Sequence, residues 1–211
     1  MEVIRQQIIE AISDEAATHL LQNALAAKAD QVARIVDLPQ DEAAARLLDF
    51  VIRYIEDVPP MLDDLSDAAA ETGLTAYVQP VVQIAREFFI TPPQAVAGDA
   101  GLASLMYKAY LAHRLLEEVN ESYVFRVGQP LIPMDMTLAN VIVHTLIGEP
   151  FANDLDALVD AANRRLFSQQ KAFQSQEFKA FIARRETSNL IQIWQRWPSL
   201  SGEMGLMSNL I

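Results

Sequence analysis

The sequence predicts an all-α protein, a single multi-helix globular domain of about eight to ten helices. Three observations predict this fold class. Apolar residues recur at steps of three and four along most of the chain, 51% of its 211 residues are hydrophobic, and prolines and glycines fall between the periodic runs. An apolar content this high also excludes a disordered protein. The length suits one continuous domain, in which we distinguish an N-terminal helical segment, residues 1–57, packed on a main body, residues 58–211.

The sequence pattern of the N-terminal segment predicts three helices. An apolar stripe over residues 3–12 marks the first helix. Ser13 is followed by two acids, the pattern of a helix N-cap, because negative charge stabilises the positive end of a helix. We therefore expect a second helix from Ser13 to Val36. A third begins near Asp41 and ends before two consecutive prolines, 59 and 60, since proline lacks the amide donor that a helix requires.

In the main body, the apolar periodicity predicts helices over residues 61–71, 74–89, 102–121, 135–147, 154–170, 176–185 and 188–197. The run from Leu102 to Glu121 is apolar on nearly every side, which predicts a central helix surrounded by the others. Residues 122–133 interrupt the pattern and favour a short extended or hairpin excursion. The Ser-, Gly- and Met-rich C-terminal tail is expected to fray.

The net charge of −12 excludes a general nucleic-acid-binding protein. The charge is polarised along the chain. Residues 1–160 hold 25 acids and 9 bases, a balance of −16, whereas residues 161–211 hold 7 bases and 3 acids, a balance of +4. The basic C-terminal third either packs on the acidic body or presents a face that binds an anion or a partner.

The chain contains no cysteine, so disulfides, thiol nucleophiles and sulfur-ligated zinc are excluded. The chain has no run of 18 apolar residues, so we predict no membrane span. Its first residues lack the apolar core of a signal peptide. We therefore expect a cytoplasmic protein.

A cluster of carboxylates at Asp63, Asp64 and Asp67 is the strongest metal-site candidate. On a helix these side chains share a face, and carboxylate oxygens suit Mg²⁺. The Asp-Asp-x-x-Asp pattern resembles the first aspartate motif of isoprenoid synthases, and that resemblance implies a magnesium-bound diphosphate. The alternative is that acids near a helix start need only the helix dipole to explain them, and we predict no metal and no cofactor. Two pairs spaced four residues apart, Glu15–His19 and His113–Glu117, are predicted ion pairs.

Residues 89–112 carry a partial resemblance to a known family. Phe89-Ile90-Thr91-Pro92-Pro93 is followed by Gly98-Asp99, Gly101-Leu102 and the helical run Ala109-Tyr110-Leu111-Ala112. This order of motifs resembles the YkvA-like helical domain, a family of unknown function. Tyr107 and Lys108 stand where that family has paired aspartates. The resemblance implies a helical module and carries no functional residues over to this chain.

The sequence lacks the motifs of nucleophilic catalysis and of phosphate-binding loops, and favours a non-enzymatic protein-interaction or regulatory module. Tryptophan and arginine are enriched at binding hot spots, which makes a C-terminal group the candidate partner-binding face: Arg184, Arg185, Trp194, Arg196 and Trp197. The partner is another protein or a second copy of the chain. The alternative function is a binder of a small or lipid-like ligand, or a magnesium-dependent enzyme that uses the three aspartates. This alternative predicts a cavity of roughly 300–1,000 Å³ with those carboxylates at its mouth. The preferred function rests on the expectation that no hollow lined by ionisable side chains lies beside the central helix.

Overall fold

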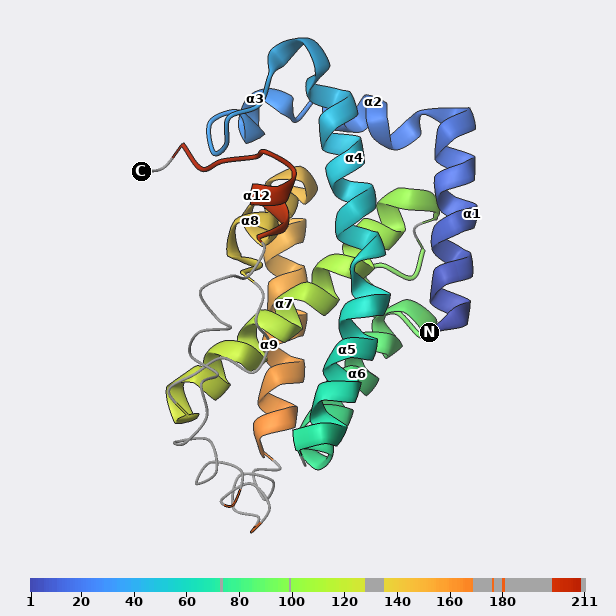
Figure 1. The fold of residues 1–211 in the computed structure, drawn as a ribbon. Coiled ribbons are helices and arrows are strands. Elements are labelled where there is room, and N and C mark those ends of the chain that lie inside the picture. The colour runs from blue at the N-terminus through green and yellow to red at the C-terminus, as the bar shows by residue number, and fades with distance from the viewer. Residues whose placement is uncertain are drawn as a thin grey trace.

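The structure is a computed structural model that describes residues 1–72, 74–98, 100–127, 135–168 and 199–209, together with the isolated residues 176 and 180. Over these residues the secondary structure is helical, apart from two isolated β-bridges (Figure 1). The predicted all-α fold class is confirmed. Within the described ranges, no helix has both the length and the apolarity that a bilayer crossing requires.

The N-terminal helices form a corner. α1 (Glu2–Thr18) is followed by α2 (Leu20–Ala26) and α3 (Ala29–Val32). The predicted helix start at Ser13 is wrong, because α1 continues through it and ends only at His19, whose φ of 53° lies in the left-handed region. The backbone turns at this residue, and α2 leaves at an angle to α1 (Figure 1). A left-handed residue is a common way to end a helix.

α4 (Ala43–Glu56) and α5 (Val58–Thr72) follow a short 3-10 turn and run nearly end to end (Figure 1). The break between them falls at Asp57, so Pro59 and Pro60 lie in the first turn of α5. Proline is tolerated there because the amides of a first helical turn have no intrahelical partner in any case. α6 (Thr75–Ile90) then folds back beside α5. One face of α4 is fully buried, with Leu47, Phe50, Val51, Tyr54 and Ile55 each at 0% exposure.

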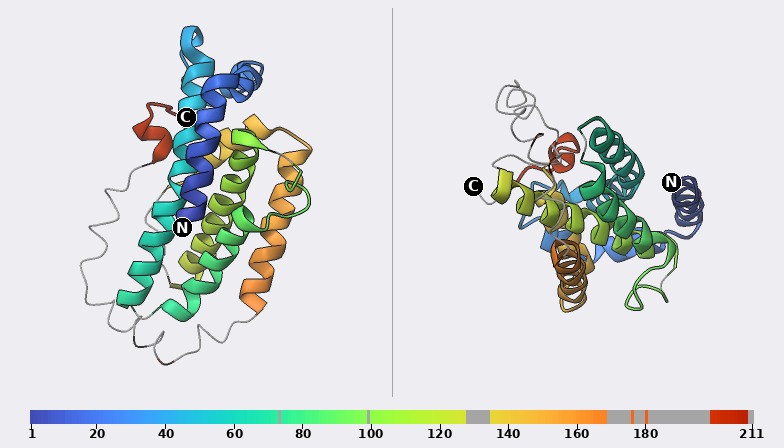
Figure 2. Two further views of the ribbon diagram at one scale, coloured as in Figure 1. Left: turned by 90° about the vertical axis from the view of Figure 1, so that its right-hand side faces the viewer. Right: turned by 90° about the horizontal axis from the view of Figure 1, so that it is seen from below.

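α7 (Gly101–Val127) is the central helix. It contacts α1, α4, α5, α6, α8 and α9, and its apolar residues from Ala109 to Val119 are almost completely buried. Figure 2 shows the other helices around it when the molecule is seen from below. The predicted excursion at 122–133 is wrong for its first half, because residues 122–127 continue α7. Tyr123 in that turn is buried, and its ring lies 6.0 Å from that of Tyr77 on α6. Residues 128–133 lie outside the described part of the chain.

α8 (Thr137–Ile147) and α9 (Phe151–Ser168) cover the remaining side of α7. Residues 199–209 contain α12 (Leu200–Glu203) and return to the N-terminal corner, where Ser208 bridges Val36. Leu200 and Leu206 are buried at 5% and 2% exposure, so the expected fraying of this tail is wrong for the described residues. The helices predicted at 176–185 and 188–197 lie outside the described residues, apart from the isolated residues 176 and 180.

Candidate functional site

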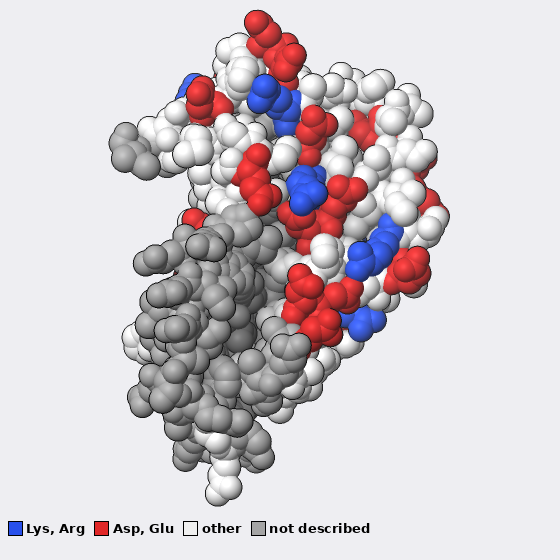
Figure 3. All heavy atoms as spheres, viewed as in Figure 1, with Lys and Arg blue, Asp and Glu red and all other residues white. Residues whose placement is uncertain are grey.

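The predicted partner-binding residues cannot be placed, because Arg184, Arg185, Trp194, Arg196 and Trp197 all lie outside the described residues. Of the C-terminal bases that are described, Arg164 is paired with Asp160 within α9, at 2.8 Å. On the face shown in Figure 3, acidic side chains with fewer basic ones among them run along α4 and α5.

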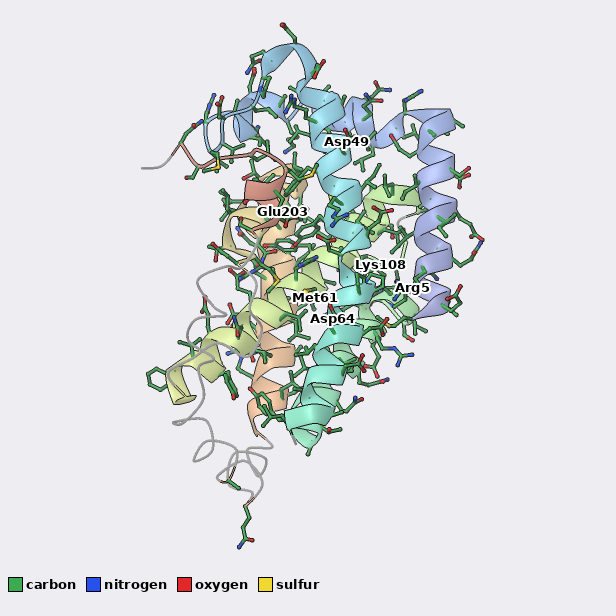
Figure 4. The ribbon with its side chains drawn as sticks, viewed as in Figure 1. Arg5, Asp49, Met61, Asp64, Lys108 and Glu203 are labelled. Carbon is green, nitrogen blue, oxygen red and sulfur yellow. The ribbon has the colours of Figure 1, made fainter. Side chains whose placement is uncertain are left out.

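The three aspartates of the metal-site candidate lie on α5 and do not act as one group. Asp63 forms an ion pair with Arg5 of α1, Oδ2 to Nη2 2.6 Å, while Asp64 and Asp67 are exposed. Figure 4 labels Arg5 on α1 and Asp64 on α5. Among the described residues, no group of three or more His, Cys, Asp or Glu side chains is arranged to hold a metal ion. The carboxylate of Asp63 therefore joins α5 to α1.

Neither predicted histidine–carboxylate ion pair forms. Glu15 is buried, and its two carboxylate oxygens accept hydrogen bonds from the backbone N–H groups of Leu21 and Gln22, at 3.0 and 2.9 Å. These donors belong to the first turn of α2 and have no intrahelical partner. Glu15 therefore caps the next helix, while His19 contacts Gln22 instead.

A buried polar network begins at Tyr54 on α4. The ring of His113 on α7 stacks on Tyr54 with centroids 4.0 Å apart, and its Nε2 donates to the Tyr54 backbone carbonyl at 2.9 Å. The Tyr54 hydroxyl donates to Oδ1 of Asn140 on α8 at 2.6 Å, and Nδ2 of Asn140 donates to Oε2 of Glu117 at 2.7 Å. The chain of contacts thus joins α4, α7 and α8 through the core.

Arg114 is the centre of the network. Its guanidinium donates through Nη1 to Glu117, through Nη2 to Glu118 at 3.1 Å, and through Nε to Oδ1 of Asp156 on α9 at 3.2 Å. The hydroxyl of Tyr110 donates to the same Asp156 oxygen at 2.8 Å. The three carboxylates hold the guanidinium by charge-assisted hydrogen bonds, which are stronger individually than bonds between neutral groups.

The network shifts the ionisation of its members. Burial, reinforced by the neighbouring carboxylate of Asp156, raises the pKa of Tyr110. Burial alone would lower the pKa of Arg114, but hydrogen bonds and charge from Glu117 and Asp156 outweigh it and raise that pKa. Burial also lowers the pKa of His113 to about 4, opposed only by its bond to the Tyr54 carbonyl. Tyr110 therefore stays a hydrogen-bond donor, Arg114 a cation and His113 neutral near pH 7.

A hollow of about 430 Å³ opens onto this network. It is lined by Tyr110, Arg114, Glu117, Glu121, Thr137, Asn140, Val141, His144, Thr145 and Asp156. The expectation that no hollow lined by ionisable side chains lies beside the central helix is therefore wrong. Most of its polar groups are nevertheless bonded to one another, and Nε2 of His144 also lies 3.5 Å from Oδ2 of Asp156. Groups so thoroughly paired hold helices together and leave few donors or acceptors for a ligand.

A second hollow, the apolar cavity, has a volume of about 540 Å³ and lies between the corner of α1 and α2 and the start of α7. Its wall is mostly Ala, Leu and Met side chains: Ala11, Ala17, Leu20, Leu21, Ala24, Leu25, Ala100, Leu102, Ala103, Met106 and Leu146. The remaining lining residues are Asp14, Glu15, Thr18, Lys28, Gly101 and Tyr107. A mostly apolar wall with few polar groups is typical of small-molecule sites.

No family model matches this chain, and no curated protein or solved structure shows a significant match to it. The resemblance of residues 89–112 to YkvA-like domains stays a prediction. The structure places the helical part of that segment in the first half of α7.

Sequence reasoning located neither hollow, although its alternative function included a ligand cavity. For the polar network a signal was present, since Arg114, Glu117 and Glu118 interrupt a helix that is otherwise predicted to be buried. A charged residue on a buried helix requires partners, and its presence marks a polar site. The apolar cavity gave no such signal, because its wall consists of the residue types that also fill a packed core.

Proposed function

We propose that the protein binds a small, largely apolar molecule in the apolar cavity. The observation that carries this proposal is the volume and chemistry of the cavity: about 540 Å³, within the range of ligand pockets, and walled mainly by aliphatic side chains. Covering those side chains with a ligand removes apolar surface from water, which is the main driving force for such binding.

The polar network supports this function indirectly. It joins α7 to α9 through Arg114 and Asp156, and α7 to α8 through Glu117 and Asn140. The helices α7 and α8 also supply part of the cavity wall. A rigid wall lowers the cost of ordering the site when a ligand binds. The network is therefore the support of the site, and the cavity is the site itself.

The enzymatic alternative gains no support from the geometry. None of Asp63, Asp64 and Asp67 lines either hollow, and Asp63 is already paired with Arg5. The preferred function from the sequence, a protein-interaction or regulatory module, stays a prediction because its residues lie outside the described part of the chain. The polar hollow beside α7 removes one premise of that prediction. We retain residence in the cytoplasm as part of the proposal.

A fluorescence titration with the neutral apolar dye N-phenyl-1-naphthylamine tests the proposal. We expect saturable binding by the wild-type protein and a loss of binding of about tenfold or more in Ala17→Phe, which introduces a ring at the cavity wall. Ala16→Phe is the matched control, since Ala16 is the adjacent residue, is also exposed and does not line the cavity. Equal binding by the two variants, or no saturable binding by the wild type, would contradict the proposal.

A further inference from the structure

We propose that the ligand of the apolar cavity carries a single carboxylate, and that the ammonium group of Lys28 binds it. This inference rests on the proposed function and names the class of ligand: an amphipathic monocarboxylate with an apolar body. Lys28 follows α2 and is one of the few charged residues in the cavity wall.

The ammonium of Lys28 lies close to the backbone of Gly148, the residue that ends α8. A Cβ built on Gly148 would lie 2.6 Å from Nζ of Lys28, which is closer than carbon and nitrogen can approach. The φ of Gly148 is +84°, a conformation that residues with a side chain rarely adopt. Glycine at this position therefore lets the lysine side chain pass closely over the backbone beside the cavity.

The charge of Lys28 is without an anionic partner in the described structure. The ion pairs of the described residues engage Arg5, Arg46, Arg53, Arg114, Arg164 and His144, and none engages Lys28. Lys28 is also half-buried. The negative end of α8 lies beside this ammonium but offers no carboxylate to pair with it. A ligand carboxylate at the cavity wall supplies the missing partner.

Two acids in the same wall limit the charge of the ligand. Both oxygens of Glu15 accept backbone hydrogen bonds from α2, which stabilises that carboxylate in place. Asp14 is exposed, so solvent weakens the effect of its charge without removing it. With one cation and two carboxylates in the wall, and a net charge of −12 on the chain, a headgroup with more than one negative charge is repelled. The site therefore fits a monocarboxylate better than a phosphate.

Calorimetric titration with octanoate and with 1-octanol tests the inference, because the two probes share an apolar chain and differ in the charged headgroup. We expect Lys28→Met to weaken octanoate binding about five- to tenfold and to change 1-octanol binding less than about twofold. Arg34→Met is the matched control: it removes the same charge from an exposed residue outside the cavity wall and should change neither affinity beyond the screening effect of one distant charge.

A second variant covers the case in which Lys28→Met does not fold. Asp14→Asn changes an exposed side chain, so the fold is retained, and removing its charge should tighten octanoate binding while leaving 1-octanol binding unchanged. If Lys28 only stabilises the end of α8, Lys28→Met lowers the unfolding free energy and affects both probes equally, which overturns the inference and leaves the proposed function standing. If neither probe binds to the wild type, the proposed function fails, and the inference fails with it.

Discussion

Asp156 on α9 accepts a hydrogen bond from Nε of Arg114 on α7, at 3.2 Å, across 42 residues of sequence. The arginine side chain is 23% exposed and the aspartate 31%, so the contact lies at the edge of the core. Glu117 and Glu118 accept hydrogen bonds from the two terminal nitrogens of the same guanidinium. This contact joins the central helix to the last long helix of the described structure.

Loss of the guanidinium should destabilise the protein. Arg114→Met leaves the carboxylates of Glu117 and Asp156 without their cation, and we expect the free energy of unfolding to fall by about 2 kcal/mol, less than for a fully buried pair because water reaches both groups. Urea unfolding of Arg114→Met, Asp156→Asn and the double variant gives the coupling between the two residues. A coupling energy of about 1 kcal/mol is expected. Additive effects of the single variants would show that the contact contributes nothing of its own.

The stability of the protein should depend on the ionisation of His113. Burial lowers the pKa of this histidine to about 4, whereas a histidine in the unfolded chain has a pKa near 6.5. Between these pH values the unfolded chain binds more protons than the folded protein, so stability decreases as the pH falls. The stabilising contribution is complete above pH 6.5, and on the order of 3 kcal/mol is lost by pH 4.

His113→Gln isolates this contribution, because glutamine keeps an amide donor for the Tyr54 carbonyl and does not titrate. We expect urea unfolding at pH 7 and at pH 4.5 to show a larger loss of stability in the wild type than in the variant. His19→Asn is the control, since His19 is exposed and asparagine tolerates its left-handed backbone. The same pH dependence in His113→Gln as in the wild type would assign the acid sensitivity to other groups.

The capping role of Glu15 predicts an asymmetry between adjacent residues. Glu15→Ala removes the acceptor of two backbone N–H groups at the start of α2 and should lower the unfolding free energy by about 1–2 kcal/mol. Asp14→Ala changes an exposed side chain and should cost less than about 0.5 kcal/mol. Thermal or urea unfolding distinguishes the two variants. If the two variants lose the same unfolding free energy, Glu15 contributes through its charge and not through the two capping hydrogen bonds.

The C-terminal segment gives a second adjacent pair. Leu206 is 2% exposed and Met207 is 63% exposed. Leu206→Ala should lower the unfolding free energy by about 2–4 kcal/mol, because it leaves a cavity where the segment packs on the N-terminal corner. Met207→Ala should change it by less than about 0.5 kcal/mol. Urea unfolding measures both variants. If Leu206→Ala lowers the unfolding free energy as little as Met207→Ala, this segment does not contribute to the stability of the core.

Several differences between the sequence-based predictions and the structure have a common physical origin. The sequence Ser13 to Glu15 has the residue types of an N-cap, but the helix continues through it because Glu15 caps α2 instead, six and seven residues further on. The aromatic run after residue 121 favours a strand locally, yet it is helical because Tyr123 packs against Tyr77 of α6. In each case a contact with another helix outweighed the local preference.

The all-α fold class and the central position of α7 follow from the sequence alone, because periodicity and breaker residues are local properties that one chain segment displays by itself. The pairing of Arg114 with Asp156, the position of Lys28 over Gly148 and the hollows beside them were decided by the tertiary structure. These arrangements depend on how separate helices cross and in which register they pack. No periodic pattern encodes that geometry, since many packings bury the same apolar faces.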